Sequence, residues 1–183
     1  GTGDAVIIAA GMGVAPWTVL AQGIGIQFNW TIGEATFFIS VVVLFLWIPL
    51  REKPGIGTIL NAILIAAAID VMEPHLPHPQ EQFYQLIQVL FGTILVGIGS
   101  GFYLTANLGP GPRDGWMTGL QRITNIPIGR VRTTIETIAL LIGWKLGGVF
   151  GVGTIIFAIL IGPVVALFLQ LTDRIWGTNE PIS

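Results

Sequence analysis

Two adjacent charged residues, Arg113 and Asp114, follow a Gly/Pro run at the end of a long apolar segment. The run Gly109-Pro110-Gly111-Pro112 breaks a helix, because proline lacks the backbone N–H and glycine costs backbone order. Pro112 suits the first turn of a new helix, where a missing donor costs nothing. The sequence therefore predicts a broken helix whose second half points free N–H groups and a positive dipole end at its surroundings.

Two interpretations of Arg113 and Asp114 stay open. An ionisable side chain in an apolar environment is costly unless it is paired or hydrated, which makes it a candidate functional group. In the first interpretation Arg113 faces a cavity and binds an anion together with the N–H groups that follow Pro112. In the second, the pair lies at the membrane rim, where Asp114 caps the short helix and Arg113 contacts lipid headgroups.

A second charged pair, Arg132 and Glu136, has the spacing i, i+4 and therefore lies on one face of a predicted helix. In one interpretation Glu136 is a proton-coupling carboxylate gated by Arg132. In the other, the two residues form a structural ion pair that fixes this helix against Arg113 or Asp114 of its neighbour.

Asp4 and Asn107 complete the set of candidate solute contacts. Asp4 lies in an apolar segment, where an unpaired acid is protonated or faces water, whereas Asn107 lies at the break and also suits hydrogen bonding between helices. His75 and His78 suggest a metal site, but Pro77 between them argues against the spacing that aims two imidazoles at one ion. We predict no metal site, no cofactor and no catalytic residues, because the sequence contains no cysteine and no hydrolytic triad.

The composition indicates a membrane protein. Charged residues make up 10% of the chain, against about 25% in soluble domains, and hydrophobic residues make up 52%. A soluble domain of 183 residues cannot cover itself with so few charges, so lipid is the expected solvent. A net charge of -2 without a basic tail argues against nucleic acid as a partner. The first apolar segment, Gly1 to Met12, is too short to cross a bilayer, so we expect a longer native N-terminus.

The sequence also contains an internal repeat. Aligning residues 1–70 with 97–166 at a fixed offset of 96 gives 20 identities in 70 positions. Composition alone predicts about 5 or 6. An apolar composition common to both segments does not explain all of these matches. Those that it leaves unexplained are Gly1/Gly97, Gly3/Gly99, Gly13/Gly109, Pro16/Pro112, Gly23/Gly119, Gly33/Gly129, Gly55/Gly151, Gly57/Gly153 and Thr58/Thr154.

Each repeat shows the same order of predicted elements. An apolar segment (1–12; 83–108) is followed by a short amphipathic helix (16–27; 112–124), a second span (33–50; 129–146) and a third span (57–72; 153–171). Three spans per repeat place the two repeats in opposite orientations. We therefore predict an all-α membrane protein of six transmembrane helices in two inverted three-helix repeats, with broken helices at Gly13-Pro16 and Gly109-Pro112. Residues 1–72 form the first repeat, 73–82 an outer acidic Pro-rich linker, and 83–183 the second repeat with a cytoplasmic tail.

The basic residues predict the orientation. With the N-terminus in the cytoplasm, seven of the eight fall on the cytoplasmic side, which satisfies the positive-inside rule and places both termini there. The seven are Arg51, Lys53, Arg113, Arg122, Arg130, Arg132 and Arg174, and the exception is Lys145. The six tryptophans fall mostly near predicted span ends, which is typical of an interfacial belt.

The chain resembles the YczE/YyaS/YitT-type bacterial integral membrane proteins, in particular the YczE branch, over essentially its whole length. The elements that carry the resemblance are Gly111-Pro112-Arg113-Asp114-Gly115, Arg132 with Ile135-Glu136, Gly143-Trp144, Gly147-Gly148, Gly151, Gly153-Thr154, Phe157-Ala158, Ile161-Gly162-Pro163, Pro16-Trp17 and Gly55-Ile56-Gly57-Thr58. Members of this family usually have an acid after Pro-Trp, where this chain has Thr18, which argues against paired acids at both breaks. The resemblance implies a protein of the bacterial cytoplasmic (inner) membrane and carries no settled biochemical role.

The predicted architecture favours a secondary transporter or permease for a small solute, an anion being one option. Its site is expected between the repeats, near Pro16 and Pro112, with Arg113 as anion contact and Glu136 or Asp4 as coupling group. The alternative is a non-catalytic structural or regulatory subunit of a larger membrane complex, consistent with the small size and the long apolar faces. The expected partners are the lipid bilayer and a small-molecule solute, and a homodimer or a larger complex stays open.

Overall fold

The computed structural model describes the backbone of residues 1–176 and the side chains of residues 1–172, and within this part the chain is helical with no strand. The prediction of an all-α protein is confirmed. The predicted orientation also rests on Arg174 and on the C-terminal tail. The side chain of Arg174 and the tail 177–183 lie outside the described residues. In chain order the helices are α1 (Thr2–Ala10), α2 (Pro16–Phe28), α3 (Ile32–Phe45), α4 (Ile56–Met72), the 3-10 turn η1 (Glu73–His75), α5 (Gln82–Thr105), α6 (Pro112–Thr124), α7 (Ile128–Lys145) and α8 (Val152–Trp176).

Proline and glycine place the two breaks where the sequence predicts them. Pro16 and Pro112 begin α2 and α6, because the first helical position needs no N–H donor. Gly13 and Gly109, just before them, have φ angles of 103° and 107°, which favour glycine. The starts of α2 and α6, of α3 and α7, and of α4 and α8 are 16/112, 32/128 and 56/152, so each pair is separated by the offset of the sequence repeat.

Each break contacts the opposite half of the chain. The backbone N–H of Gly153, in the first turn of α8, donates to the carbonyl of Met12 in the first break at 2.8 Å. The equivalent N–H of Gly57, in the first turn of α4, donates to the carbonyl of Leu108 in the second break at 2.9 Å. These reciprocal hydrogen bonds satisfy carbonyl and N–H groups that a broken helix leaves free. They also bind the two halves to each other.

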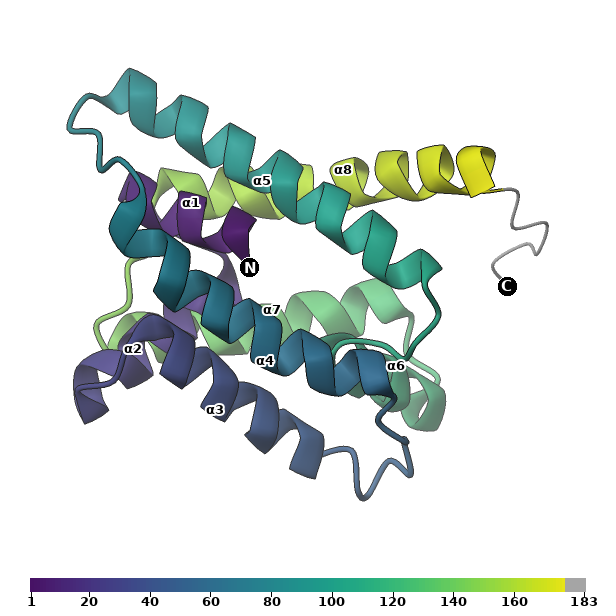
Figure 1. The fold of residues 1–183 in the computed structure, drawn as a ribbon. Helices are drawn as coiled ribbons and strands as arrows, with labels where there is room; N and C mark the ends of the chain where they lie inside the picture. Colours follow the sequence, from purple (N-terminus) through teal and green to yellow (C-terminus); the bar gives the residue numbers. More distant parts are fainter. Residues whose placement is uncertain (177–183) are drawn as a thin grey trace.

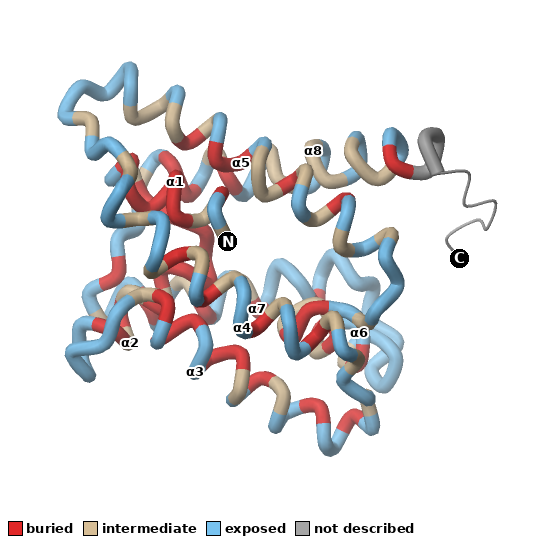
Figure 2. Tube along the Cα trace, in the orientation of Figure 1, coloured by how far each residue is buried: buried red, intermediate tan, exposed pale blue. Residues whose placement is uncertain are grey.

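The helices form two groups, which Figure 1 shows one above the other. α1, α5 and α8 pack together in one group, α2, α3, α6 and α7 in the other, and α4 contacts α1, α3 and α6. A buried apolar cluster inside the second group surrounds Trp17 and Trp47, which are 7% and 1% exposed. These two tryptophans therefore belong to the core and not to an interfacial belt. The outward faces of α4, α5 and α8 are mostly exposed (Figure 2), and their apolar side chains suit contact with lipid.

Three segments in the described chain are long and apolar enough to cross a membrane, namely Ile56–His75, Gln82–Thr105 and Val152–Thr172. The pair α2 and α3, which bends by 110°, counts as a fourth if it forms one broken span. The prediction of six spans is thus not confirmed by length and composition. α3 has 14 residues and ends at Phe45, shortly before Pro49, whose ring disfavours a helical conformation in the preceding residue. α7 has 18 residues, but charged side chains interrupt it.

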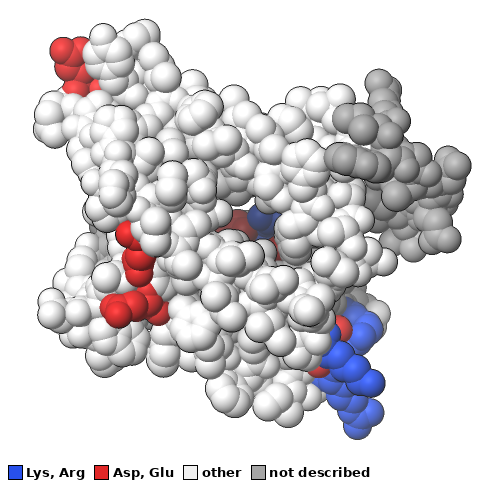
Figure 3. Space-filling model, viewed as in Figure 1, with Lys and Arg blue, Asp and Glu red and all other residues white. Residues whose placement is uncertain are grey.

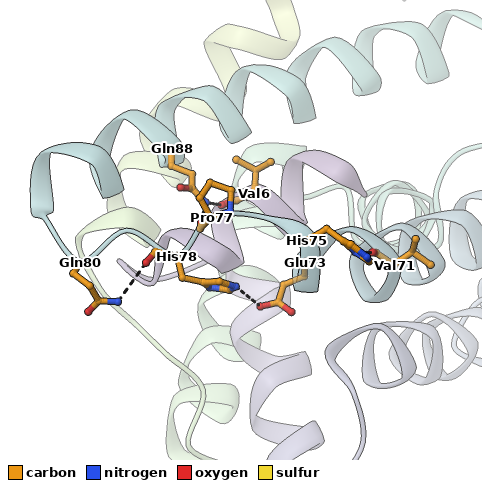
Figure 4. Close-up of polar contacts among 8 residues, drawn as sticks. All are labelled: Val6, Val71, Glu73, His75, Pro77, His78, Gln80 and Gln88. Carbon is orange, nitrogen blue, oxygen red and sulfur yellow. Dashed lines mark hydrogen bonds and ion pairs between the residues drawn. The ribbon is translucent and has the colours of Figure 1, made fainter.

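The linker between the two halves lies against α1 and α5 (Figure 4). Gln88 of α5 donates to one backbone carbonyl of α1 at 3.1 Å and to one of the linker at 3.0 Å. His78 Nε2 lies 3.9 Å from Glu73 Oε1, whereas His75 Nδ1 contacts the Val71 carbonyl at 2.8 Å. The two imidazoles therefore face different partners. Within the described residues, no group of three or more His, Cys, Asp or Glu side chains is placed to hold a metal ion.

Candidate functional site

A cavity of about 660 Å³ lies between the two helix groups. Figure 3 shows a hollow in the middle of one face, with acidic and basic atoms visible inside it. Five of the six candidate residues from the sequence line this cavity, namely Asp4, Arg113, Asp114, Arg132 and Glu136. The sixth, Asn107, is exposed in the turn between α5 and α6, where its φ of 49° suits asparagine, and it is not part of the lining.

The lining comes from equivalent positions of the two halves. Pairs of lining residues separated by 96 positions are Asp4/Ser100, Ala15/Gly111, Pro16/Pro112, Trp17/Arg113, Thr36/Arg132, Ser40/Glu136, Asn61/Phe157 and Ile65/Ile161. The cavity therefore lies where the two halves meet. Its charge is asymmetric, because the second half contributes four of the five charged side chains and the first half only Asp4.

Arg113 is half-buried in the first turn of α6, and its guanidinium carbon lies 5.0 Å from the centre of the Trp17 ring. This distance allows a cation–π interaction. Within the described residues, no hydrogen bond and no ion pair shorter than 4.0 Å joins the guanidinium to another side chain. Asp4, Asp114 and Glu136 line the same cavity and lie beyond ion-pair distance of the guanidinium. The Arg113 N–H donors are thus available to a molecule in the cavity.

Asp114 contributes to the wall through a tyrosine that the sequence analysis missed. The Tyr103 hydroxyl donates to Asp114 Oδ2 at 2.9 Å and accepts from the backbone N–H of Gly111 at 2.6 Å. Tyr103 lies near the end of α5, so these hydrogen bonds hold the two sides of the break together. The start of α6 has no side-chain cap, and the interpretation of Asp114 as a helix cap is therefore wrong. The only signal for Tyr103 was a hydroxyl in an apolar segment close to the break.

Arg132 and Glu136 form the ion pair that their spacing allows. Arg132 Nε donates to Glu136 Oε1 at 2.9 Å, and both side chains line the cavity from α7. The pair does not extend to Arg113 or Asp114 within ion-pair distance. The charges of Arg132 and Glu136 therefore largely neutralise each other at the cavity wall.

α7 and α8 lack the close contact that α3 and α4 make. A Cβ on Gly33 of α3 would lie only 2.4 Å from the carbonyl oxygen of Ala66 in α4. The equivalent residues, Gly129 and Gly162, have nothing within 4 Å of an added Cβ. Side chains of α7 and α8 consequently face each other across the cavity.

Comparison with known proteins identifies the family. Residues 1–170 match a family described as of unknown function, DUF6198. The chain belongs to this family. An uncharacterized protein of Haemophilus influenzae is 44% identical to this DUF6198 chain over 175 residues, which are 96% of the chain and 80% of the relative. The uncharacterized membrane protein YczE of Bacillus subtilis is 33% identical over 159 residues, 86% of the chain and 74% of YczE.

A third relative of this DUF6198 protein is the uncharacterized protein YyaS of Bacillus subtilis, 24% identical over 176 residues, 94% of the chain and 88% of YyaS. The resemblance to YczE-type proteins predicted from the sequence is therefore confirmed. The description of YczE as a membrane protein and the apolar helices together support a membrane location. No solved structure gives a significant match to the chain.

Proposed function

We propose that this DUF6198 protein is a permease that carries a small polar solute across the bacterial cytoplasmic membrane. One observation carries the proposal. The Arg113 guanidinium faces a cavity between the two halves without a hydrogen-bonded partner in the described chain. A charged group withdrawn from water is costly unless something pairs with it, and an anionic group of a solute provides that pairing. Arg113 is therefore the contact for the anionic group.

The same cavity accounts for how α7 crosses the membrane in this proposal. Arg132 and Glu136 line the cavity and pair with each other, so α7 does not have to present these charges to lipid. With α3, α7 and the first apolar segment, which contains α1, counted as spans beside the three long apolar segments, the chain makes six passes. The reciprocal contacts of the two breaks and the offset of 96 support an inverted repeat, the plan in which transporters place solutes between repeats.

The distribution of charge supports one orientation. Basic side chains gather at the end of the molecule formed by α6 and the α3–α4 connection (Figure 3), where Arg122 pairs with Glu52 at 3.0 Å. Acidic side chains are visible at the opposite end. In this proposal the basic end faces the cytoplasm, in agreement with the positive-inside rule.

Ligand-dependent thermal stability tests the proposal. The purified protein is heated in detergent with small anions, zwitterions and cations, beside Arg113→Gln and the charge-matched control Arg130→Gln, which changes an exposed residue outside the cavity. A ligand at 100 times its dissociation constant adds about 2.7 kcal/mol to the unfolding free energy, which is readily seen in the melting temperature. We expect one chemical class to stabilise the wild type and Arg130→Gln but not Arg113→Gln. Uptake of that ligand into proteoliposomes then separates transport from binding.

Stabilisation that Arg113→Gln retains in full contradicts the assignment of Arg113. Stabilisation by none of the three classes contradicts the permease proposal as a whole. That result favours the alternative of a structural or regulatory subunit, which co-purification with its complex in mild detergent then tests.

A further inference from the structure

The charged side chains of the cavity are not all equally engaged. Glu136 is paired with Arg132 at 2.9 Å, and Asp114 accepts a hydrogen bond from a tyrosine hydroxyl at 2.9 Å. Two charges remain without a hydrogen bond or an ion pair within 4.0 Å among the described residues, the Asp4 carboxylate of α1 and the Arg113 guanidinium of α6. One is negative and one is positive, and they come from opposite halves of the chain.

These two groups line the same cavity but do not pair directly. Asp4 of α1 and Arg113 of α6 carry opposite charges and belong to the lining of one cavity. Yet the two side chains are separated by more than the 4.0 Å of an ion pair, and both face the same cavity of about 660 Å³. A molecule in this cavity that carries both charges therefore has a partner for each of them in the lining.

The balance of charge distinguishes three classes of solute. The side chains that line the cavity include three carboxylates and two guanidinium groups, so their formal charge sums to -1 (two minus three). A simple anion would satisfy Arg113 but would add a negative charge beside Asp4, Asp114 and Glu136. A simple cation would satisfy Asp4 but would leave Arg113 without a partner. A zwitterion satisfies both groups.

We propose that the solute is a small zwitterion whose ammonium group binds Asp4 and whose carboxylate binds Arg113. This inference rests on the proposed function, because it assigns the solute class of the same cavity. Asp4 and Arg113 then act as the two ends of one site. The aromatic face of Trp17 lies 5.0 Å from the Arg113 guanidinium and stabilises the Arg113 end of the site.

Two sets of matched ligands test the inference at pH 7. The first set is glycine, acetate and methylamine, and the second is leucine, 4-methylpentanoate and 3-methylbutylamine. Within each set either the ammonium group or the carboxylate group is removed and the rest of the molecule is retained. Affinities are measured by thermal shift on the purified full chain. We expect at least one zwitterion to bind about tenfold or more tightly than both of its singly charged analogues, because each removed group leaves one charge of the site unpaired.

Two variants assign the two ends. Asp4→Asn is expected to remove the advantage of the zwitterion over its carboxylate analogue, and Arg113→Gln the advantage over its amine analogue. Glu81→Gln, which neutralises an exposed acid of the linker, serves as the control and is expected to bind like the wild type. The wild-type comparison within each set does not depend on whether a variant folds.

The outcomes separate this inference from the proposed function. If the carboxylates bind as tightly as the zwitterions and Arg113→Gln abolishes their binding, the zwitterion inference is wrong and the permease proposal stands. If only the amines bind, the inference is wrong and so is the role of Arg113. If neither zwitterion and no other ligand binds, both proposals are wrong.

Discussion

Adding one methyl group to Gly33 tests the close contact between α3 and α4. A Cβ at this position would lie 2.4 Å from the Ala66 carbonyl oxygen and 2.4 Å from Asp70 Cγ, whereas ordinary contact begins at 3.4 Å. The backbone of α4 would have to move by about 1 Å (3.4 minus 2.4). Asp70 cannot move without weakening its own hydrogen bonds, because it accepts from Gly33 N at 2.8 Å and from Thr31 Oγ1 at 2.6 Å.

The expected loss of stability in Gly33→Ala follows from two unfavourable contributions and one favourable contribution. Overpacking a close contact typically costs about 1–3 kcal/mol, and weakening a hydrogen bond to a carboxylate adds about 1.5–3 kcal/mol if the bond is lost. Alanine recovers up to about 1 kcal/mol of helix propensity. We therefore expect the free energy of unfolding to fall by about 2 kcal/mol, measured by denaturant or thermal unfolding in mild detergent.

Gly129→Ala is the matched control, because it makes the same change at the equivalent position of the second half. An added Cβ there meets nothing within 4 Å, so the variant is expected to be neutral or more stable by up to about 1 kcal/mol. Equal destabilisation by the two substitutions would refute the reasoning, because it would mean that α7 packs onto α8 as closely as α3 packs onto α4.

Two further substitutions test the contacts at the second break. Trp47→Phe is expected to lower the free energy of unfolding by about 2 kcal/mol, because it removes a buried hydrogen bond from Trp47 Nε1 to the Pro112 carbonyl at 2.9 Å and leaves a small cavity. Denaturant unfolding measures this free energy, and an unchanged free energy of unfolding contradicts the prediction. Thr58→Val is expected to cost about 1 kcal/mol more than Thr154→Val in the same assay, because only Thr58 donates to a carbonyl of the opposite break, that of Pro110 at 2.7 Å. Equal costs would show that this hydrogen bond contributes nothing.

The positions of the helices could be predicted from the sequence because local chemistry determines them. A proline at the first helical position marks the start of α2 and of α6, and a glycine precedes α4 and α8. The repeat offset then relates each start in one half to one in the other. Where a helix ends is less local. α3 stops near Phe45 because the chain turns before Pro49 so that Trp47 packs into the core, and no periodicity signals that turn.

The charged residues of the cavity could be predicted because ionisable side chains are rare in this chain, and each one needs a reason to be there. The neutral residues of the cavity could not be predicted in this way. Tyr103 and Trp17 look like ordinary members of apolar helices, and only the fold brings Tyr103 to Asp114 and Trp17 under Arg113. Trp17 and Arg113 occupy equivalent positions of the two halves. A repeat alignment shows that the positions are equivalent, but it does not show that the two side chains are in contact.

The two halves carry different side chains at equivalent interfaces of a similar backbone. At the interface of α2 and α7, a Cβ on Gly143 would lie 2.4 Å from the backbone nitrogen of Leu20, so these helices are in close contact. The residue equivalent to Gly143 is Trp47, which fills the space between α3 and α6 and packs on Gly115. A tryptophan in place of a glycine prevents the second interface from closing in the same way. The two halves therefore meet asymmetrically, and among the described residues Arg113 at the cavity is the charged group that has an aromatic ring, that of Trp17, as its partner.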